Sequence, residues 1–443
     1  MAKSKRAAIK KSSSVKNETT NLSSSIDDLI LAAADSGNNS LETGRYIVTL
    51  KEGAEKKGLD SLNAQGLRMA NSRDFKDSAV GLESLTGADG IFFNEIGCAL
   101  VSGTAAKERS MATDFDAATD SPISVIEPEY FVFASDTDSS EFLRGFLKAT
   151  EVISKEIGGA QKAEDQEDDT GAQVLGNTWG LTACRVPSSP RSGLGIKVAV
   201  LDTGMFLPHP DFIGRPIISR SFIAGQSVMD GNGHGTHCIG TACGTKTPPG
   251  IIQRYGIGWR ATIFAGKVLS NSGSGSTATV LAGMNWAIAN RCQVISMSLG
   301  AQTPVQAAYT AAGQAALNNG CLIIAAAGNS AAPTGAPANS PTIMSVAALN
   351  PNRTPANFSN FGKVEIAAPG VGVFSSWLMP QRYNTISGTS MATPHVAGCA
   401  ALWAQTSPNI RGMNLWRKLT ATARPLPFVP ARVGAGLVQA PQI

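Results

Sequence analysis

Four polar residues in the C-terminal half of the sequence could together perform nucleophilic catalysis. Asp202 follows the apolar run KVAVL, His234 lies in the glycine-rich segment GNGHGTHCIG, and Ser390 lies in GTSMATPHVAG. Asn329 follows another apolar run, CLIIAAAG. A serine hydroxyl becomes an effective nucleophile when a histidine accepts its proton, and a carboxylate is needed to hold that histidine in the right tautomer. An amide side chain beside them could donate a hydrogen bond to a developing oxyanion.

Each of these residues also has an ordinary structural explanation. Taken alone, Asp202 could shape a turn, His234 could be a hydrogen-bonded structural residue, and Ser390 could cap a helix. The dipeptide Gly328-Asn329 is by itself only a turn signal. The catalytic interpretation is favoured because the four residues follow or begin different elements that we expect to meet at one edge of a sheet.

The sequence from about residue 173 to 443 alternates short apolar segments with longer helical ones. IKVAVLDTG, ATIFAGKVL, CQVISMSLG, CLIIAAAGN and IMSVAALN have the length and composition of buried strands. Helical segments such as TATVLAGMNWAIANR lie between them. This alternation predicts an α/β fold with a mostly parallel, doubly wound sheet and helices on both faces. Chemistry gathers at the carboxyl ends of the strands in such sheets, and the candidate residues occur at those ends or in the helices that follow.

Four regions follow from composition and pattern. Residues 1–43 are rich in Ser, Asn and Lys and are predicted to be a disordered tail. Residues 44–134 alternate strand, helix, strand, helix and strand, with IFFNEIGCALVSG as a single strand, which predicts a small α/β sandwich. Residues 135–174 are predicted to be a linker that contains a helix and the acidic stretch AEDQEDDTG. Residues 175–443 form the main α/β domain.

The overall composition excludes several classes of protein. With 443 residues, 43% hydrophobic and 16% charged, the chain has a substantial globular core. A formal charge of +4 is small for a nucleic-acid-binding protein of this length, and no apolar run approaches the roughly 18 residues of a membrane helix. We expect a monomer with neither nucleic-acid nor membrane partners.

The N-terminal sequence and the cysteines bear on localisation. MAKSKRAAIKK is followed by polar residues and not by the apolar run of a secretory signal. The seven cysteines are odd in number and occupy apolar contexts, which favours buried free thiols. A bridge between Cys292 and Cys321, which begin similar strands, is the alternative. We expect a cytoplasmic protein, and export by another route is also open.

Four motifs resemble those of a known enzyme family. VAVLDTG, GNGHGTHCIGT, AAAGNS and SGTSMATPHVAG are similar to the Asp, His, oxyanion-Asn and Ser motifs of the subtilisin-like serine proteases, in that family's order. The resemblance implies that Asp202 orients His234, that His234 acts as general base and then acid, that Ser390 attacks, and that Asn329 stabilises the oxyanion. It implies a serine endopeptidase that acts on proteins or peptides and requires no cofactor for its chemistry. A peptide ligase or cyclase with the same acyl-enzyme, or an inactive binding protein, remains an alternative.

The resemblance extends to the substrate-binding segments. SMSLG, which contains Ser298, Leu299 and Gly300, resembles the family's edge strand that pairs with an extended substrate backbone. GSGS, which begins at Gly273, resembles the opposing loop.

Further matches concern the specificity pocket and a thiol. Ala327 and Gly335 correspond to walls of the pocket for the residue before the scissile bond, and their small size implies room for a large apolar side chain. Cys238 matches the thiol beneath the catalytic histidine in the proteinase-K-like branch. His237 and His395 match structural positions of the family, and His209 lies in its loop after the Asp strand.

Calcium and the N-terminal region are matched less completely. Asp211 matches one carboxylate ligand of a structural calcium site, but GTKTPPGIIQRYGIGW lacks the asparagines of the family's calcium loop, so calcium stays an open hypothesis. Residues 44–134 resemble the family's inhibitory propeptide through RYIVTL and VIEPEYFVFA. This implies a latent precursor whose own propeptide is an intramolecular inhibitor, with self-cleavage between about 134 and 176.

Overall fold

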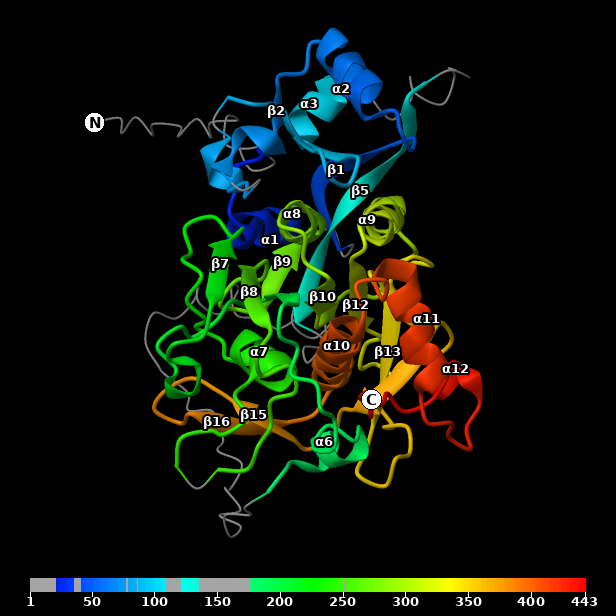
Figure 1. Ribbon diagram of the computed structural model, residues 1–443. Helices are drawn as coiled ribbons and strands as arrows, with labels where there is room; N and C mark the ends of the chain where they lie inside the picture. Colours follow the sequence, from blue (N-terminus) through cyan, green and yellow to red (C-terminus); the bar gives the residue numbers. More distant parts are fainter. Residues whose placement is uncertain are drawn as a thin grey trace, which may run out of the picture.

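The computed structural model describes residues 21–35, 41–76, 79–85, 87–108, 121–134, 176–250 and 252–443. The predicted linker 135–174, with its helix and acidic stretch, lies outside the described residues. The described part divides into an N-terminal domain, residues 41–134, and a C-terminal domain, residues 176–443 (Figure 1).

The C-terminal domain is built around a parallel sheet with strand order β14-β13-β12-β10-β6-β8-β7. Its strands are β6 (Lys197–Asp202), β7 (Ile217–Ser221), β8 (Thr262–Lys267), β10 (Val294–Met297), β12 (Leu322–Ala326), β13 (Met344–Leu349) and β14 (Ile366–Pro369). Every pairing among them is parallel. The predicted doubly wound parallel sheet is therefore confirmed.

Both faces of this sheet are apolar and both are covered by helices. In β6, Val198 and Val200 pack into the cluster that holds α7 (His234–Cys243) and α10 (Thr389–Thr406), whereas Ala199 and Leu201 pack into the cluster that holds α8 (Thr277–Ala289) and α9 (Ala307–Asn318). Successive side chains of a strand point to opposite faces, so a strand buried on both sides becomes continuously apolar. That is why KVAVL contains no polar residue after Lys197.

The remaining elements of the C-terminal domain surround this core. The short elements are α6 (Trp179–Ala183), β9 (Ser274–Ser276), β11 (Leu299–Gly300), β15 (Val373–Ser376), β16 (Tyr383–Ile386), α11 (Gly412–Thr422) and α12 (Pro430–Val433). The strands β15 and β16 form an antiparallel hairpin that leads directly into α10. This connection makes the hairpin a support for the first turn of α10.

The N-terminal domain is a small sheet with strand order β5-β1-β4-β3-β2. Its elements are β1 (Glu42–Leu50), α2 (Glu55–Ala64), β2 (Met69–Asn71), β3 (Gly90–Phe93), β4 (Cys98–Val101), α3 (Gly103–Glu108) and β5 (Ile123–Ala134). The segment predicted as one strand, 91–103, is instead two antiparallel strands, β3 and β4. Gly97, at φ 65, provides the left-handed conformation that the tight turn between them needs.

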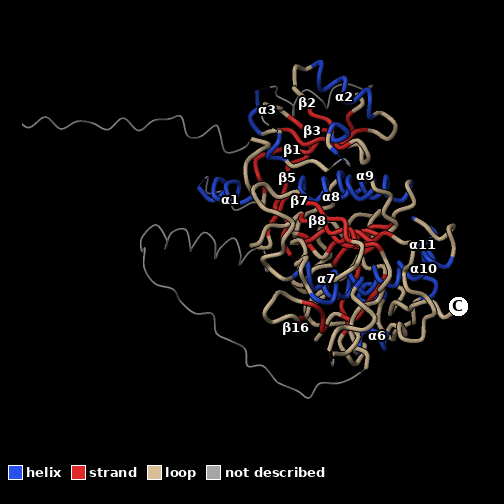
Figure 2. Tube along the Cα trace, turned by 60° about the vertical axis from the view of Figure 1, so that its left-hand side comes forward, coloured by secondary structure: helices blue, strands red, loops and turns tan. Residues whose placement is uncertain are grey.

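The two domains form a continuous stack of layers. Helices α2 and α3 cover one face of the small sheet, and the other face packs on α8 and α9 of the C-terminal domain. Figure 2 shows the succession from α2 and α3 through the small sheet, α8 and α9, and the parallel sheet to α7 and α10. Helices α8 and α9 are therefore apolar on two sides, because they lie between two sheets.

A helix lies within the tail that was predicted to be disordered. Helix α1 covers Ile26–Asp35, so the prediction of disorder up to residue 43 is wrong for this segment. The Ser25 hydroxyl accepts the Asp28 amide and donates to its carboxylate, which caps the first turn. The sequence signal was Ser25-x-x-Asp28 followed by apolar residues at helical spacing.

Two absences can be stated for the described residues. All seven cysteines fall within them, and each is a buried free thiol, so Cys292 and Cys321 are not bridged. Within the same ranges, the helices are too short or too polar to cross a lipid bilayer.

Candidate active site

The carboxyl end of β6 carries the first candidate residue. Asp202 is the last residue of β6 and is fully buried, and its backbone carbonyl accepts the amides of Val268 and Leu269 just after β8. These bonds hold the strand end rigidly, because both neighbours belong to the adjacent strand connection. The carboxylate therefore projects from a fixed backbone at the carboxyl edge of the sheet, where active sites of parallel sheets form.

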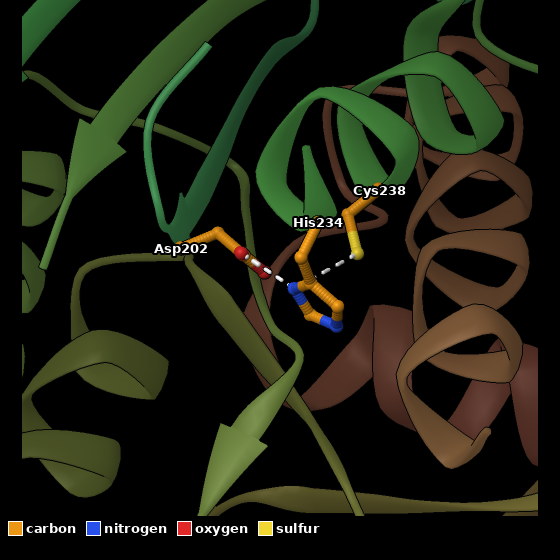
Figure 3. Close-up of side chains that lie close together, drawn as sticks. All are labelled: Asp202, His234 and Cys238. Atoms are coloured by element: carbon orange, nitrogen blue, oxygen red, sulfur yellow. Dashed lines mark hydrogen bonds and ion pairs between the residues drawn. The ribbon is translucent and has the colours of Figure 1, made fainter. Parts of the chain in front are cut away.

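Asp202 and His234 form a direct pair. The His234 Nδ1 lies 2.7 Å from the Asp202 Oδ1, and the Thr203 amide donates to the same oxygen at 2.7 Å (Figure 3). The carboxylate accepts, so Nδ1 carries the proton and Nε2 is the basic atom of the neutral ring. The second carboxylate oxygen, Oδ2, is buried and accepts no hydrogen bond from any residue that the structure describes.

The glycines around His234 are required by close approaches. Gly233 has φ 103, and a Cβ there would come within 2.5 Å of the Trp377 ring. A Cβ at Gly235 would collide with the Gly204 carbonyl, which belongs to the turn that follows Asp202. The bare backbone therefore lets the imidazole reach the carboxylate across two closely packed loops.

Asp230 organises the loop that leads into α7, and sequence reasoning missed it. Its Oδ1 accepts the Thr203 hydroxyl at 2.9 Å and the Gly233 amide at 2.9 Å, and its Oδ2 accepts the Thr236 amide and hydroxyl at 2.9 and 2.7 Å. One buried carboxylate thus ties the turn after Asp202 to the start of the His234 helix. The signal was Asp-Gly-Asn-Gly, in which an Asp side chain commonly binds backbone amides just ahead of it.

Lys267 is a second residue that sequence reasoning missed. It is fully buried, and its Nζ donates to the Thr203 carbonyl at 2.5 Å and to the Asn271 Oδ1 at 2.8 Å. Burial lowers the pKa of Lys267 to about 8, and the nearby carboxylates of Asp230 and Asp202 oppose this fall. At neutral pH the buried side chain therefore carries a positive charge, which the two carboxylates favour.

Ser390 is held from two sides in the first turn of α10. Its hydroxyl donates to the Ser298 carbonyl at 3.3 Å, and the Ser298 hydroxyl donates to the Ser390 carbonyl at 2.8 Å. The Cys238 Sγ lies 3.7 Å from the Ser390 carbonyl and 4.0 Å from the His234 Nδ1, so it lies between the imidazole and the Ser390 backbone. The Cys238 thiol therefore joins the start of α7, which carries His234, to the start of α10, which carries Ser390.

Pro394 makes this arrangement feasible. It lies inside α10, beyond the first turn, and its missing amide would have bonded the Ser390 carbonyl. That carbonyl instead accepts the Ser298 hydroxyl, which ties α10 to the segment between β10 and β11. The proline therefore exchanges a helical hydrogen bond for a contact that fixes Ser390.

Cys238 is chemically quiet in this position. Burial raises the pKa of its thiol to about 11, against the lowering effect of His234. A thiol with this pKa is protonated at neutral pH and is a poor nucleophile.

Asn329 follows β12 and is oriented by Thr389. The Thr389 amide and hydroxyl both donate to the Asn329 Oδ1, at 2.9 and 2.8 Å. Because the oxygen is engaged in this way, the Nδ2 group is the donor end of the side chain. This is the orientation that oxyanion stabilisation needs, next to the residue that precedes Ser390.

The two predicted substrate-binding segments bind a strand of this same chain. The end of β5 pairs antiparallel with β11, with Leu299 opposite Ala134 and Gly300 opposite Phe133. It also pairs antiparallel with β9, with Ser274 opposite Phe133, and the Ala134 amide donates to the Gly273 carbonyl at 2.9 Å. Residues 131–134 therefore form the central strand between β9 and β11.

The predicted pocket walls lie next to each other. The Gly335 amide donates to the Ala327 carbonyl at 3.4 Å, and a Cβ at Gly335 would collide with the Ala301 carbonyl. Ala327 is buried. The structure thus places both small residues together, and the preference for a large apolar side chain stays a prediction.

Asp211 is surrounded by hydrogen-bond donors. Its Oδ1 accepts from the Arg382 guanidinium at 2.9 Å and the Tyr383 hydroxyl at 3.0 Å, and its Oδ2 accepts the Tyr255 hydroxyl at 2.5 Å. Arg382 also donates to the Pro249 carbonyl. Calcium needs several oxygen acceptors, whereas the groups around Asp211 are hydrogen-bond donors and a guanidinium cation, so these residues do not fit calcium. The hypothesis that Asp211 is a calcium ligand is corrected accordingly.

The other three histidines are structural. The His209 Nδ1 accepts the Asp211 amide and its Nε2 faces the Arg382 carbonyl, while His237 and His395 contact the carbonyls of Val373 and Met391. Burial lowers the pKa of all three, to about 3 for His237 and about 4 for His395. They stay neutral in the fold at neutral pH.

Comparison with known proteins identifies the class to which this fold and site belong. Residues 193–436 match the model of the subtilase family, Peptidase S8, and the chain belongs to that family. It is 40% identical over 283 residues to an alkaline protease of Alkalihalobacillus alcalophilus, which covers 62% of this chain and 72% of that protein. It is 40% identical over 268 residues to Subtilisin Savinase of Lederbergia lenta, which covers 59% and 96%.

A solved structure agrees with these sequence relatives. A cold-adapted subtilisin-like serine proteinase superposes with a TM-score of 0.53 at 33% identity, covering 60% of this chain and 98% of that one. The protein is accordingly a serine endopeptidase of the subtilisin type, and proteins are its substrates.

Proposed function

We propose that Asp202, His234 and Ser390 form the catalytic triad, with Asn329 as the oxyanion donor. The Asp202–His234 hydrogen bond at 2.7 Å supports this assignment, because it sets the tautomer in which Nε2 can accept a proton. Ser390 attacks the scissile carbonyl while His234 takes its proton, and the imidazolium then donates that proton to the leaving amine. Water hydrolyses the acyl-enzyme by the same route in reverse.

We propose further that the chain is a self-inhibited precursor. The observation that carries this proposal is the antiparallel pairing of β5 with both β9 and β11, which is how an extended peptide would add to these strands. Two carboxylates fasten the strand: Glu127 accepts the amides of Ala307 and Ala308 at the start of α9, and Glu129 accepts the Ala278 amide at the start of α8. Negative charge at a helix N-terminus is favourable.

Glu129 is adapted to this buried position. Burial alone would raise its pKa, but the Arg45 guanidinium and the hydrogen bonds from Arg45, Ser276 and Thr43 outweigh burial and lower the pKa. Glu129 therefore stays ionised when the two domains are docked.

The test is to express the full chain with Ser390→Ala and with the control substitution Ser188→Ala, at an exposed serine. Ser390→Ala should remain a single uncut chain that hydrolyses no casein and does not react with a fluorophosphonate probe. Ser188→Ala and the wild type should be cleaved between residues 134 and 176 and should become active. Cleavage of Ser390→Ala at the wild-type rate in a pure preparation would contradict self-processing. Intact-mass analysis of peptide products separates hydrolysis from ligation, because ligation gives products heavier than or isomeric with the substrate.

A further inference from the structure

The strand that occupies the cleft is buried on its outer face as well as its inner face. Side chains alternate along a strand, and Val132 and Ala134 pack into the apolar cluster of the C-terminal domain. Phe131 and Phe133 point the other way, yet they are only 0% and 1% exposed. Something other than the cleft must therefore cover them.

Helix α1 provides that cover. Ile26, Leu29 and Ile30 form one apolar cluster with Phe131, Phe133 and Ile223. Ile223 belongs to the C-terminal domain, just after β7, so α1 contacts the inhibitory strand and the enzyme at the same time. In Figure 1, α1 lies beside β9 and beneath the N-terminal domain.

The chain just before α1 is joined to the same place by one side chain. The Arg45 Nη1 donates to the Leu22 carbonyl at 3.3 Å, and its Nη2 donates to the Ser276 hydroxyl in β9 at 3.3 Å. The same guanidinium is paired with Glu129 of β5 at 2.6 Å, with both side chains fully buried. Arg45 thus links the N-terminal segment, the inhibitory strand and the substrate-binding strand.

Helix α1 depends on this docking for its order. It has 10 residues, which is shorter than the roughly 12–15 residues that make an isolated helix even marginally stable in water. Its opposite side is exposed, with Leu31 at 41%. The helix should therefore form and be lost together with its contacts on Phe131, Phe133 and Ile223.

We propose that residues 21–35 are a second inhibitory element, in which α1 clamps the outer face of the cleft strand against the enzyme. The proposal rests on the proposed function, because it assumes that residues 131–134 inhibit. The clamp deepens that inhibition: after the chain is cut beyond residue 134, the strand leaves the cleft only when α1 undocks from Ile223. Inhibition then outlasts the first cleavage, and α1 sets its duration.

A matched pair of substitutions on one helix tests the clamp in the full chain. Leu29→Asp places a charge on the fully buried face of α1, and Leu31→Asp places the same charge on its exposed face. The measurement is the lag between the first cleavage and the appearance of peptidase activity. Leu29→Asp should shorten the lag about tenfold, and Leu31→Asp should leave it within twofold of wild type. The kcat/KM of the mature enzyme should be the same for all three.

The outcomes separate the clamp from the function on which it rests. A wild-type lag that Leu29→Asp does not shorten, or that both variants shorten equally, overturns the clamp and leaves self-inhibition intact. A wild-type chain that is fully active before any cleavage contradicts the proposed self-inhibition itself.

A second measurement covers the case in which Leu29→Asp fails to mature. In a Ser390→Ala background, Leu29→Asp should speed amide hydrogen exchange at residues 131–134 about tenfold relative to Leu31→Asp. Equal protection in the two variants would overturn the proposal.

Discussion

Asp202, the last residue of β6, and Asp211, in the segment that follows β6, are both buried, yet their carboxylates have opposite sets of hydrogen-bond partners. Asp211 accepts hydrogen bonds on both oxygens from Arg382, Tyr255 and Tyr383. Asp202 uses one oxygen for His234 and the Thr203 amide, and the other accepts nothing from the described residues. The Asp211 carboxylate is paired with Arg382, which is always charged, whereas the Asp202 carboxylate faces the His234 imidazole, whose charge can change.

The hydrogen-bond partners of the two buried carboxylates indicate a different role for each. A buried carboxylate normally needs a full set of partners, so Asp211 has the environment of a structural junction. Asp202 keeps spare capacity for the moment at which His234 becomes an imidazolium, with Lys267 as the resident counter-charge. An incompletely satisfied acid beside a histidine is therefore the better indicator of chemistry than burial alone.

The largest expected effect is the loss of activity when Asp202 is replaced. Asp202→Asn should lower kcat on a peptide substrate by about 10⁴-fold, because an amide supports the wrong tautomer of His234 and cannot stabilise the imidazolium. Since the precursor of this variant would mature slowly, the prosegment should be removed by added protease before assay. Activity within tenfold of wild type would contradict the assignment of Asp202.

The next largest effect is the loss of stability when Asp211 loses its charged partner Arg382. Arg382→Met should lower the free energy of unfolding by about 3 kcal/mol, because it leaves the Asp211 carboxylate buried without its cation. Arg417→Met, at an exposed arginine, is the control and should change stability by less than about 0.5 kcal/mol. Both are measured by denaturant unfolding in a Ser390→Ala background, which prevents autolysis.

Metal removal tests whether Asp211 binds calcium. Asp211→Asn and wild type should respond identically to EDTA in thermal unfolding, because the Asp211 oxygens are occupied by protein donors. A loss of EDTA sensitivity confined to Asp211→Asn would restore the calcium hypothesis.

The smallest effect concerns a neutral structural histidine. The pKa of His395 falls from its ordinary value near 6.5 to about 4 through burial, so between these pH values the unfolded state binds more protons than the folded state. Stability from this residue is complete above about pH 6.5 and declines as pH falls, by about 1.4 kcal/mol per pH unit. His395→Gln should reduce the slope of stability against pH between 6 and 4.5 by that amount. An unchanged slope in this variant would refute the argument.

The sequence was most informative where one pattern dominated. Continuous apolar runs such as KVAVL predicted the parallel sheet, because a strand buried on both faces has no polar side. The site residues at its strand ends could be located because each follows a run that was easy to identify. The segments predicted to pair with an extended substrate backbone pair here with residues 131–134 of the chain itself, and their pairing with a substrate stays a prediction.

The misses have a common cause, which is that they depend on partners distant in sequence. The Asp211 carboxylate looks like a metal ligand until Arg382 is placed beside it. Lys267 is an unremarkable residue at a strand end until the Thr203 carbonyl and the Asn271 side chain accept its hydrogen bonds. Pro394 acts through Ser298, and α1 is stabilised by Phe131 and Phe133. Local propensity cannot supply such contacts, although the Ser25–Asp28 cap was a local signal that could have been used.

The layered contact between the domains has a consequence for the fate of the N-terminal domain. One face of its sheet, which includes Ile47, Phe93 and Leu100, is buried against α8 and α9. That face is therefore covered by the C-terminal domain and not by a helix of its own domain. Once separated, a sheet of this size would expose an entire apolar face to water and would lose much of its cooperativity. Under the proposed maturation, the departing inhibitor is left as a loosened chain in front of a working peptidase. Its destruction would then make activation a one-way event.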